Sequence, residues 1–339
     1  MNQEKSSTTQ AGNVYVPYEE RTGKESIVWF TRELSAEGLL RAFARVADSL
    51  QGKVAIKLHT GEPDGPNIIP RPWVKKLVEE RISDATIVET NPYYEGGRDT
   101  TEKHRKTIAE NGWTFCPVDI MDEDGTVLLP VKGGNWYTEM SMGGHIVNYD
   151  SMLTLTHFKG HAMGGFGGSN KNLGIGCADG KVGKKWIHNP NDDENEWVVV
   201  EEELMERMTE STKAVIDHFG ENIVYVNVLR NMSVSCDCEG ANAAPVVTPN
   251  VGILASLDLL AIDQASVDMV FAMKPTQNHD LVERILSRHG LRQLSHMKEL
   301  GMGNDRYELI DMDNGDAIID AAQAVADVVS FEEDTSPVA

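Results

Sequence analysis

The chain has 339 residues, 40% of them hydrophobic, which is enough to bury a large core in one α/β unit or in two lobes. Its 53 acidic and 31 basic residues give a formal net charge of −22, which argues against a nucleic-acid partner. The sequence has four cysteines, no apolar stretch of membrane-spanning length and a polar beginning without the apolar segment of a signal peptide. We therefore expect a cytoplasmic protein with neither a nucleic-acid nor a membrane partner.

Strands and helices alternate through the first third of the chain. Short apolar runs predict strands over residues 26–30, 54–58 and 85–90. Apolar residues at helical spacing predict helices over residues 36–50, 72–82 and 100–111. Turn-rich loops follow the second and third strands, at the edge where open α/β sheets bind ligands, and they carry His59, Glu62, Tyr93 and Arg98. The alternation predicts an α/β fold with a mostly parallel sheet and flanking helices.

The rest of the chain continues this pattern less regularly. Further strands are predicted over residues 126–131, 145–149, 152–156, 223–229, 251–254 and 306–310. Further helices are predicted over residues 201–219, 259–272, 280–288, 291–300 and 316–328. We assign residues 21–330 to a single α/β domain, with a lobe boundary near 150–190 as the alternative. A flexible tail of residues 1–20 precedes this domain, and a C-terminal tail of residues 331–339 follows it.

A glycine-dense segment, residues 154–188, carries three histidines, five lysines and one cysteine. Because glycine costs backbone entropy, this density indicates either positive φ angles or close approach of the backbone to something bound. The segment completes neither a P-loop nor a dinucleotide fingerprint, so its signal is a general anion-binding loop. The candidate cofactor-binding residues are Gly167, Gly168, Asn170, Lys171, Asn172 and Lys184. A tight structural loop packed on the sheet edge is the alternative.

Cys236 and Cys238 have Cys-x-Cys spacing, which in an extended segment points both sulfurs to the same side. Both could then reach one metal ion, and His161, Cys177 and His188 are candidates for the remaining ligands if the fold brings them near. A pair of buried, inert thiols is the alternative.

Three side chains are candidates for catalysis. Lys171 could be a desolvated amine or a covalent anchor, with a solvated surface lysine as the alternative. Asp263 lies within an apolar helix and is a better candidate for a buried role than Asp258, which N-capping explains. His161 is the third candidate.

The sequence resembles the family called domain of unknown function 362, whose members are often labelled iron–sulfur cluster-binding proteins. The resemblance covers nearly the whole chain after about residue 50. It rests on His157-Phe-Lys-Gly-His161, Gly164-Gly-Phe-Gly-Gly168 with Lys171-Asn-Leu-Gly174, His188, Cys236-Asp-Cys238 and Gly252-Ile-Leu-Ala-Ser256 with Asp258. The chain lacks the Cys-x-x-Cys-x-x-Cys runs of the ferredoxin-like module that many members carry, and Leu259 stands where a proline is expected. The resemblance implies a metal ion or an iron–sulfur cluster as cofactor.

A shorter, glycine-driven likeness is to lactate racemase of the nickel-pincer type. In that family a block of histidine, glycine, lysine and histidine of similar layout holds an organometallic cofactor, which is bound covalently to the lysine. Carried over by position, the likeness implies His161 and His188 on the metal side and Lys171 as the attachment lysine.

Our leading hypothesis is a redox or isomerase-like metalloenzyme that acts on a small anionic substrate. The alternatives are a metal or iron–sulfur carrier, an electron-transfer protein, or an anion-binding protein with structural cysteines. The metal hypotheses share one geometric expectation. The histidine- and lysine-bearing segment 157–188 and the cysteine-bearing segment 236–238 should meet at one cavity.

Overall fold

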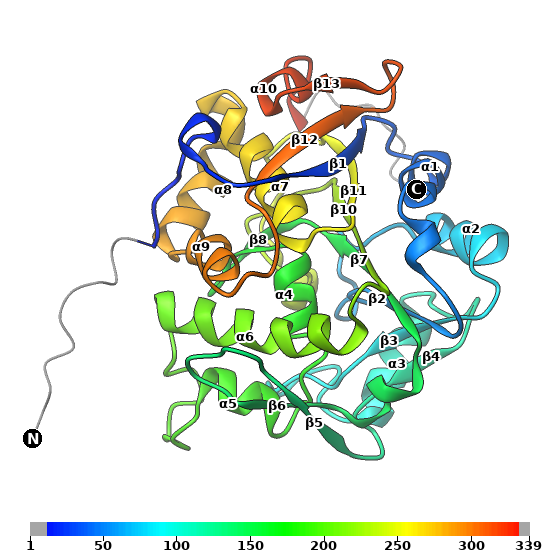
Figure 1. Cartoon of the computed structure of the whole chain (residues 1–339). Coiled ribbons are helices and arrows are strands. Elements are labelled where there is room, and N and C mark those ends of the chain that lie inside the picture. Colours follow the sequence, from blue (N-terminus) through cyan, green and yellow to red (C-terminus); the bar gives the residue numbers. More distant parts are fainter. Residues whose placement is uncertain (1–11, 332–339) are drawn as a thin grey trace, which may run out of the picture.

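A computed structural model describes residues 12–331, and one large twisted sheet organises them (Figure 1). Its strand order is β13-β12-β1-β11-β10-β7-β2-β3-β4. The strands are β1 (Glu25–Thr31), β2 (Val54–Lys57), β3 (Ala85–Glu89), β4 (Val118–Ile120), β7 (Ser151–His157), β10 (Ile223–Leu229), β11 (Gly252–Ser256), β12 (Arg306–Asp311) and β13 (Ala317–Ile319). All except β11 and β13 run in the same direction, which confirms the predicted mostly parallel sheet.

Two short hairpins lie outside this sheet. They are β5 (Thr126–Pro130) with β6 (Glu139–Gly143), and β8 (Lys159–His161) with β9 (Gly165–Gly167). The second hairpin follows β7 directly, so it begins at the carboxyl end of a central strand.

Helices cover both faces of the sheet, as the predicted α/β fold requires. They are α1 (Ala36–Ala44), α2 (Arg71–Arg81), α3 (Thr101–Glu110), α4 (Ser169–Gly174), α5 (Gly183–His188), α6 (Glu201–Phe219), α7 (Leu259–Ala272), α8 (Pro275–Ser287), α9 (Arg292–Glu299) and α10 (Ala321–Ala324). Side chains of α1 and α2 form one apolar cluster with the sheet, and those of α4, α6 and α7 form another. Neighbouring residues of β2 show the division, because Ala55 packs in the second cluster and Ile56 in the first.

The strand order decides where the site forms. Four neighbouring strands, in the order β3, β2, β7 and β10, run parallel to one another. All four are buried along their whole length. Their carboxyl ends therefore meet at one edge of the sheet. The segments that follow them bring residues 58–70, 90–100, 158–170 and 230–240 to this edge, which is where open parallel sheets bind ligands.

Two predicted elements are wrong. Residues 145–149 were expected to form a strand, but Gly144–Asn148 is a short 3-10 helix, and the His145 and Tyr149 side chains both bond to Asp119. The helix expected over 316–328 is mostly absent. Asp316 has a left-handed φ of 59°, the next residues form the edge strand β13, and Asp320 accepts a bond from the Gln323 amide and so starts a helix of one turn.

The helix expected over 36–50 is also shorter than predicted. It ends at Ala44, and a separate 3-10 turn, Ala47–Ser49, follows.

The domain limits stay a prediction, although the strands of the one large sheet are drawn from residues 25 to 319. Most of the tail expected over 1–20 lies outside the described residues, as does nearly all of the tail over 331–339. Within the described part, the Tyr18 hydroxyl bonds to Glu25 and to the Tyr307 carbonyl, so residues near 18 are attached to the sheet.

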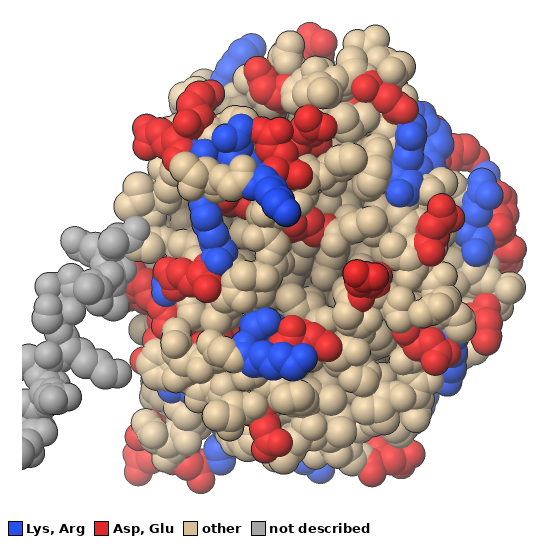
Figure 2. Space-filling model, viewed as in Figure 1, with Lys and Arg blue, Asp and Glu red and all other residues tan. Residues whose placement is uncertain are grey.

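None of the described helices combines the length and apolar character needed to cross a membrane. Acidic and basic side chains are interspersed over the face of the molecule seen in Figure 2. Ion pairs such as Arg45 with Asp316 and Lys298 with Asp305 join oppositely charged groups on the described surface.

Candidate functional site

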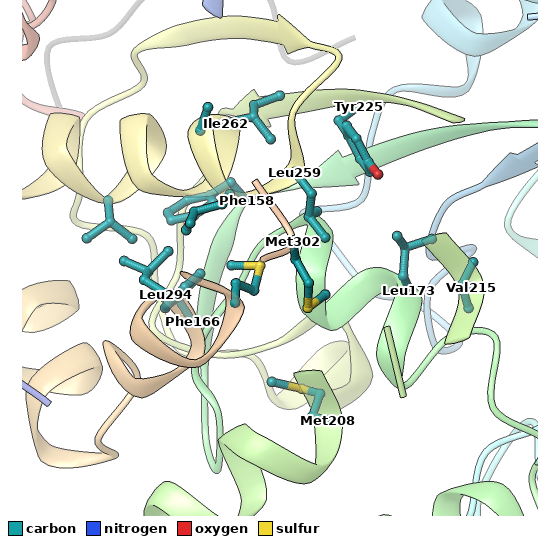
Figure 3. Close-up of a cluster of buried hydrophobic side chains, with 14 of the residues drawn as sticks. Phe158, Phe166, Leu173, Met208, Val215, Tyr225, Leu259, Ile262, Leu294 and Met302 are labelled. Atoms are coloured by element: carbon teal, nitrogen blue, oxygen red, sulfur yellow. The ribbon is translucent and has the colours of Figure 1, made fainter. Parts of the chain in front are cut away.

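The β8–β9 hairpin brings the glycine-dense segment against the cysteines. Phe158 precedes this hairpin and Phe166 lies within β9. Their ring centroids are 5.6 Å apart, and both belong to the buried cluster that includes Ile262 of α7 (Figure 3). The Gly160 amide donates to the Ser233 carbonyl at 2.7 Å. A Cβ at Gly160 would lie 2.5 Å from the Val234 carbonyl oxygen, so only glycine permits this approach. The glycine here serves close contact between two backbone segments.

This contact places His161 beside both cysteines of the Cys-x-Cys motif. The ligand atoms of His161, Cys236 and Cys238 all lie within 4.8 Å of one another. The His161 Nε2 is 4.0 Å from the Cys238 sulfur. The central residue, Asp237, is buried and pairs with His157 at 2.9 Å and with Lys159 at 2.9 Å. Asp237 therefore anchors the motif, and its two neighbours present their sulfurs to His161.

Two backbone groups determine how the His161 ring carries its proton. Its Nδ1 accepts hydrogen bonds from the Gly164 amide at 2.8 Å and the Met163 amide at 3.2 Å. In the neutral ring the proton is then on Nε2, the atom that faces the sulfurs. Burial, followed by the nearby Lys171 charge, lowers the pKa of His161, so the neutral ring is the favoured form. As arranged, His161 donates toward a thiolate.

The two thiols differ in acidity although they share one site. A hydrogen bond from the Cys238 thiol lowers the pKa of Cys236 well below its usual value, and Lys171 and His161 act in the same direction against burial. The same bond raises the pKa of Cys238, with burial adding to the effect. One proton shared between two sulfurs is therefore the expected state of the metal-free site.

These groups line one side of a cavity of about 390 Å³. Of the predicted site residues, the cavity wall contains His161, Gly167, Gly168, Lys171, Asn172, Lys184, His188 and Cys238. The strand-end residues His59, Tyr93 and Arg98 line it as well. The structure thus brings the two sequence-remote clusters to the same cavity.

Lys171 stands out because its amine makes no hydrogen bond or ion pair with any of residues 12–331. It lies on α4 and faces the cavity, and its charge acts on His161, His188, Cys236 and Cys238. A lysine amine without a protein partner in a cavity is suited to bind an anion.

Asp263 fixes the helix that carries Lys171. Its buried carboxylate accepts from the backbone amides of Ser169 and Asn170 at 2.8 Å each, and from the Asn227 side chain at 2.9 Å. A Cβ on Gly168 would lie 2.5 Å from this carboxylate. Burial raises the pKa of Asp263 to about 6. Asp263 is not among the described residues of the cavity wall, so its predicted catalytic role would have to act through the position of α4.

Three other predicted residues lie apart from the cavity wall. Asn170 is fully buried and donates to Thr209 and Gln293. Cys177 is buried in the apolar cluster, outside the group formed by the other two cysteines, and burial raises the pKa of its thiol to about 12. Cys236 is 1% exposed and reaches the site through its contacts with Cys238 and His161.

A buried charge network forms the wall next to Cys238. The Lys57 amine lies 2.9 Å from Glu89, and Arg98 donates to Glu62 at 2.7 Å and lies 3.7 Å from Glu89. Sequence reasoning missed Lys57 and Glu89, although both are charged residues at the ends of otherwise apolar strands. A charged residue at the end of an apolar strand is the sequence signal that could have identified both.

Lys184 is held at the cavity wall by hydrogen bonds to the Thr90 hydroxyl, at 2.7 Å, and to the Asn91 carbonyl. Burial lowers the pKa of Lys184 to about 8, so near neutral pH it is a cation that can lose its proton.

His188 belongs to an aromatic part of the cavity wall with Tyr93 and Trp197. Its ring centroid lies 4.8 Å from that of Trp197 and 6.3 Å from that of Tyr93, and it is nearly parallel to the tyrosine ring. Burial lowers the pKa of His188 to about 3, which keeps the ring neutral. Its Nδ1 is buried and has no hydrogen-bond partner in the described part of the chain. His188 was predicted as a metal ligand, but the group of His161, Cys236 and Cys238 does not include it.

Fold and site together define an α/β protein with a thiol-, histidine- and lysine-lined cavity at the carboxyl edge of a mostly parallel sheet. The chain belongs to the family described as Domain of unknown function (DUF362), which matches residues 54–268. The family predicted from the sequence is confirmed.

Among solved structures, the chain is similar to the lactate racemase apoprotein from Thermoanaerobacterium thermosaccharolyticum. The identity is 12% over 88% of this chain and 85% of that one, with a TM-score of 0.40. A protein from Thermotoga maritima is similar at 8% identity over 57% of this chain and 50% of the other, with a TM-score of 0.36. The comparison with curated proteins finds no match.

Proposed function

We propose that the chain is a metalloenzyme in which Cys236 and Cys238 hold a soft transition metal at the cavity wall, beside a small anionic substrate bound by Lys171. The observation that supports this is the meeting of two thiols and His161 within 4.8 Å at a cavity that also contains an unpaired lysine amine, among the described residues. Thiolates are the protein ligands that soft metals such as zinc or copper(I) prefer.

The donor set fits a metal ion better than a cluster. The remaining cysteines, Cys116 and Cys177, are outside the group, so this chain does not supply the four thiolates that hold a typical iron–sulfur cluster. Two thiolates are also fewer than the four ligands of a closed structural site, which leaves positions open toward the cavity. A metal bound there would supply Lewis acidity or a redox couple.

Each neighbouring side chain has a role that its contacts support. The Lys171 amine pairs with the acid group of the substrate. His161, with its proton on Nε2, donates to a thiolate and so lowers the charge density on the sulfur. The buried network of Lys57, Glu89 and Arg98 keeps the wall next to Cys238 fixed.

The test is elemental analysis of anaerobically purified protein. We expect about one metal ion per chain in the natural sequence and in Cys116→Ser, and loss of that metal in the double variant Cys236→Ser and Cys238→Ser. Cys116→Ser is the matched control, because this thiol lies outside the candidate group. Absence of stoichiometric metal, or metal that survives the double substitution, would contradict the proposal.

Substitution of Lys171 distinguishes a metal carrier from an enzyme. For an enzyme, Lys171→Met weakens binding of a small anion such as acetate while the metal is retained. A carrier needs no anion site, so acetate binding that is unaffected by Lys171→Met would favour the carrier.

One specific observation favours a second candidate, a metal-free thiol enzyme. The His161 proton faces the sulfurs, and the pKa of Cys236 is lowered, as in a thiolate nucleophile. This candidate predicts protein without metal in which iodoacetamide rapidly alkylates the Cys236–Cys238 pair at neutral pH, with access from the cavity through Cys238. The elemental analysis therefore decides between the two.

A further inference from the structure

The cavity wall has a second part that neither metal binding nor anion binding uses. It consists of Tyr93, His188 and Trp197, three aromatic rings from separate segments of the chain. Each ring contacts the other two, with centroid distances of 6.3, 5.5 and 4.8 Å. Apolar side chains of Met163, Ile175, Leu204 and Met208 line the cavity as well. The cavity therefore combines charged groups with a large aromatic and apolar surface.

A second, independent observation points to a ligand here. His188 is 7% exposed, yet its Nδ1 has no hydrogen-bond partner among residues 12–331. A buried polar atom without a partner costs free energy, and a ligand group that bonds to it removes that cost. Tyr93 and Trp197 pack against this ring, and neither forms a hydrogen bond with the nitrogen.

We propose that the ligand is a small carboxylic acid with a planar, unsaturated or aromatic body that carries one hydroxyl group. This inference rests on the proposed function and names the substrate class of the same site. The carboxylate pairs with Lys171, the planar body packs against the wall of Tyr93, His188 and Trp197, and the hydroxyl donates to or accepts from the His188 Nδ1. Neutral imidazole can fill either role, because the ring proton moves between its two nitrogens.

The first part of the test measures shape and charge with probes of known chemistry. Full-length protein is titrated with benzoate, with cyclohexanecarboxylate and with the uncharged benzamide, in the metal-loaded and metal-free states. We expect benzoate to bind about two- to tenfold more tightly than cyclohexanecarboxylate in both states, because aromatic pairs add to area burial. Benzamide should bind more weakly than either acid because it cannot pair with Lys171. Equal binding of benzoate and cyclohexanecarboxylate would overturn the aromatic assignment.

Substitutions test whether the aromatic part of the wall causes the preference for benzoate. Trp197→Leu should abolish the preference for benzoate and retain the metal, since its thiol ligands are unchanged. Trp186→Leu is the matched control, because this half-buried tryptophan packs on Tyr137 and is not among the described residues of the cavity wall. A preference lost equally in both variants would contradict the assignment.

The hydroxyl is tested with the three monohydroxybenzoates. One isomer should bind about tenfold more tightly than benzoate, because it satisfies the buried His188 nitrogen. His188→Phe should keep benzoate binding and remove this gain, whereas His279→Phe, at an exposed position, should change neither. If no isomer gains over benzoate, the role of His188 is wrong. Metal content measured on the same samples reports on the proposed function separately.

Discussion

At the scale of single residues, the proton on His161 is the most consequential detail of the site. Metal-bound histidines usually donate their second ring N–H to an acceptor. The Nδ1 of His161 instead accepts from two backbone amides, so a neutral ring cannot also offer a lone pair at Nε2. The sequence indicated His161 as a site residue, but nothing in the sequence could specify this ring orientation, because it depends on the turn at residues 161–164.

The effect of His161 on the thiols can be measured directly. His161→Asn keeps a side-chain acceptor near the two amides but removes the proton facing the sulfurs. The pKa of Cys236 should therefore rise, because its thiolate loses a charge-assisted hydrogen bond. The measurement is the pH dependence of iodoacetamide reactivity in metal-free protein.

The matched control is His279→Asn, which alters an exposed histidine on α8. An unchanged reactivity profile in His161→Asn would show that the ring does not hydrogen-bond to the thiolate.

At the scale of elements, the close backbone contact of Gly160 with Val234 joins the two halves of the site. Gly160→Ala places a Cβ within 2.5 to 2.7 Å of three Val234 backbone atoms. Since backbone cannot move aside cheaply, the hairpin must shift, and we expect a loss of about 1–3 kcal/mol in the free energy of unfolding. Metal retention should fall as well, because the shift moves the β8–β9 hairpin away from residues 234–238. Chemical denaturation and elemental analysis measure the two effects.

Gly167→Ala is the control within the same hairpin, because its Cβ would meet only side-chain atoms at 3.5 Å or beyond. It should leave both stability and metal content unchanged. If Gly160→Ala behaves like Gly167→Ala, the close contact is not what assembles the site.

The sequence carried enough information for the position of the site but not for its construction. Parallel strands with polar loops at their ends predicted the edge at which His59, Tyr93 and Arg98 lie. The hairpin and the short helices α4 and α5 were missed, because glycine-dense stretches this short show no hydrophobic period. Trp197 was also missed, since it follows a loop of acidic and amide residues that reads as solvated surface.

At the scale of the whole molecule, buried neutral histidines make stability depend on pH. Burial lowers the pKa of His104 and His188 to about 3, whereas both would titrate near 6.5 in the unfolded chain. Between these values the unfolded state binds more protons, so stability is fully present above pH 6.5 and is lost as pH falls toward 3. Each such histidine contributes a slope of up to about 1.4 kcal/mol per pH unit.

The contribution of His188 can be isolated by substitution. Asp263 has the opposite effect on the pH dependence. Burial raises the pKa of Asp263 to about 6, so the stability that Asp263 contributes is lost as pH rises. The difference between the natural sequence and His188→Gln cancels this background. Between pH 4 and 6 we expect the unfolding free energy of the variant to fall less steeply with acidification, by up to about 1.4 kcal/mol per pH unit.

Chemical denaturation at a series of pH values provides the measurement, with His279→Gln as the exposed control. Parallel stability profiles for His188→Gln and the natural sequence would mean that His188 is not held neutral in the fold.

The central claim is that a metal lies between the Cys236 and Cys238 sulfurs at the wall of the cavity. Anomalous scattering from a crystal of the metal-loaded protein tests it most directly. The account predicts one peak about 2.3 Å from both sulfurs, with an open side toward Lys171. A peak elsewhere, for example at the surface group of Asp119, Glu123 and His145, or no peak at the thiols, would contradict it.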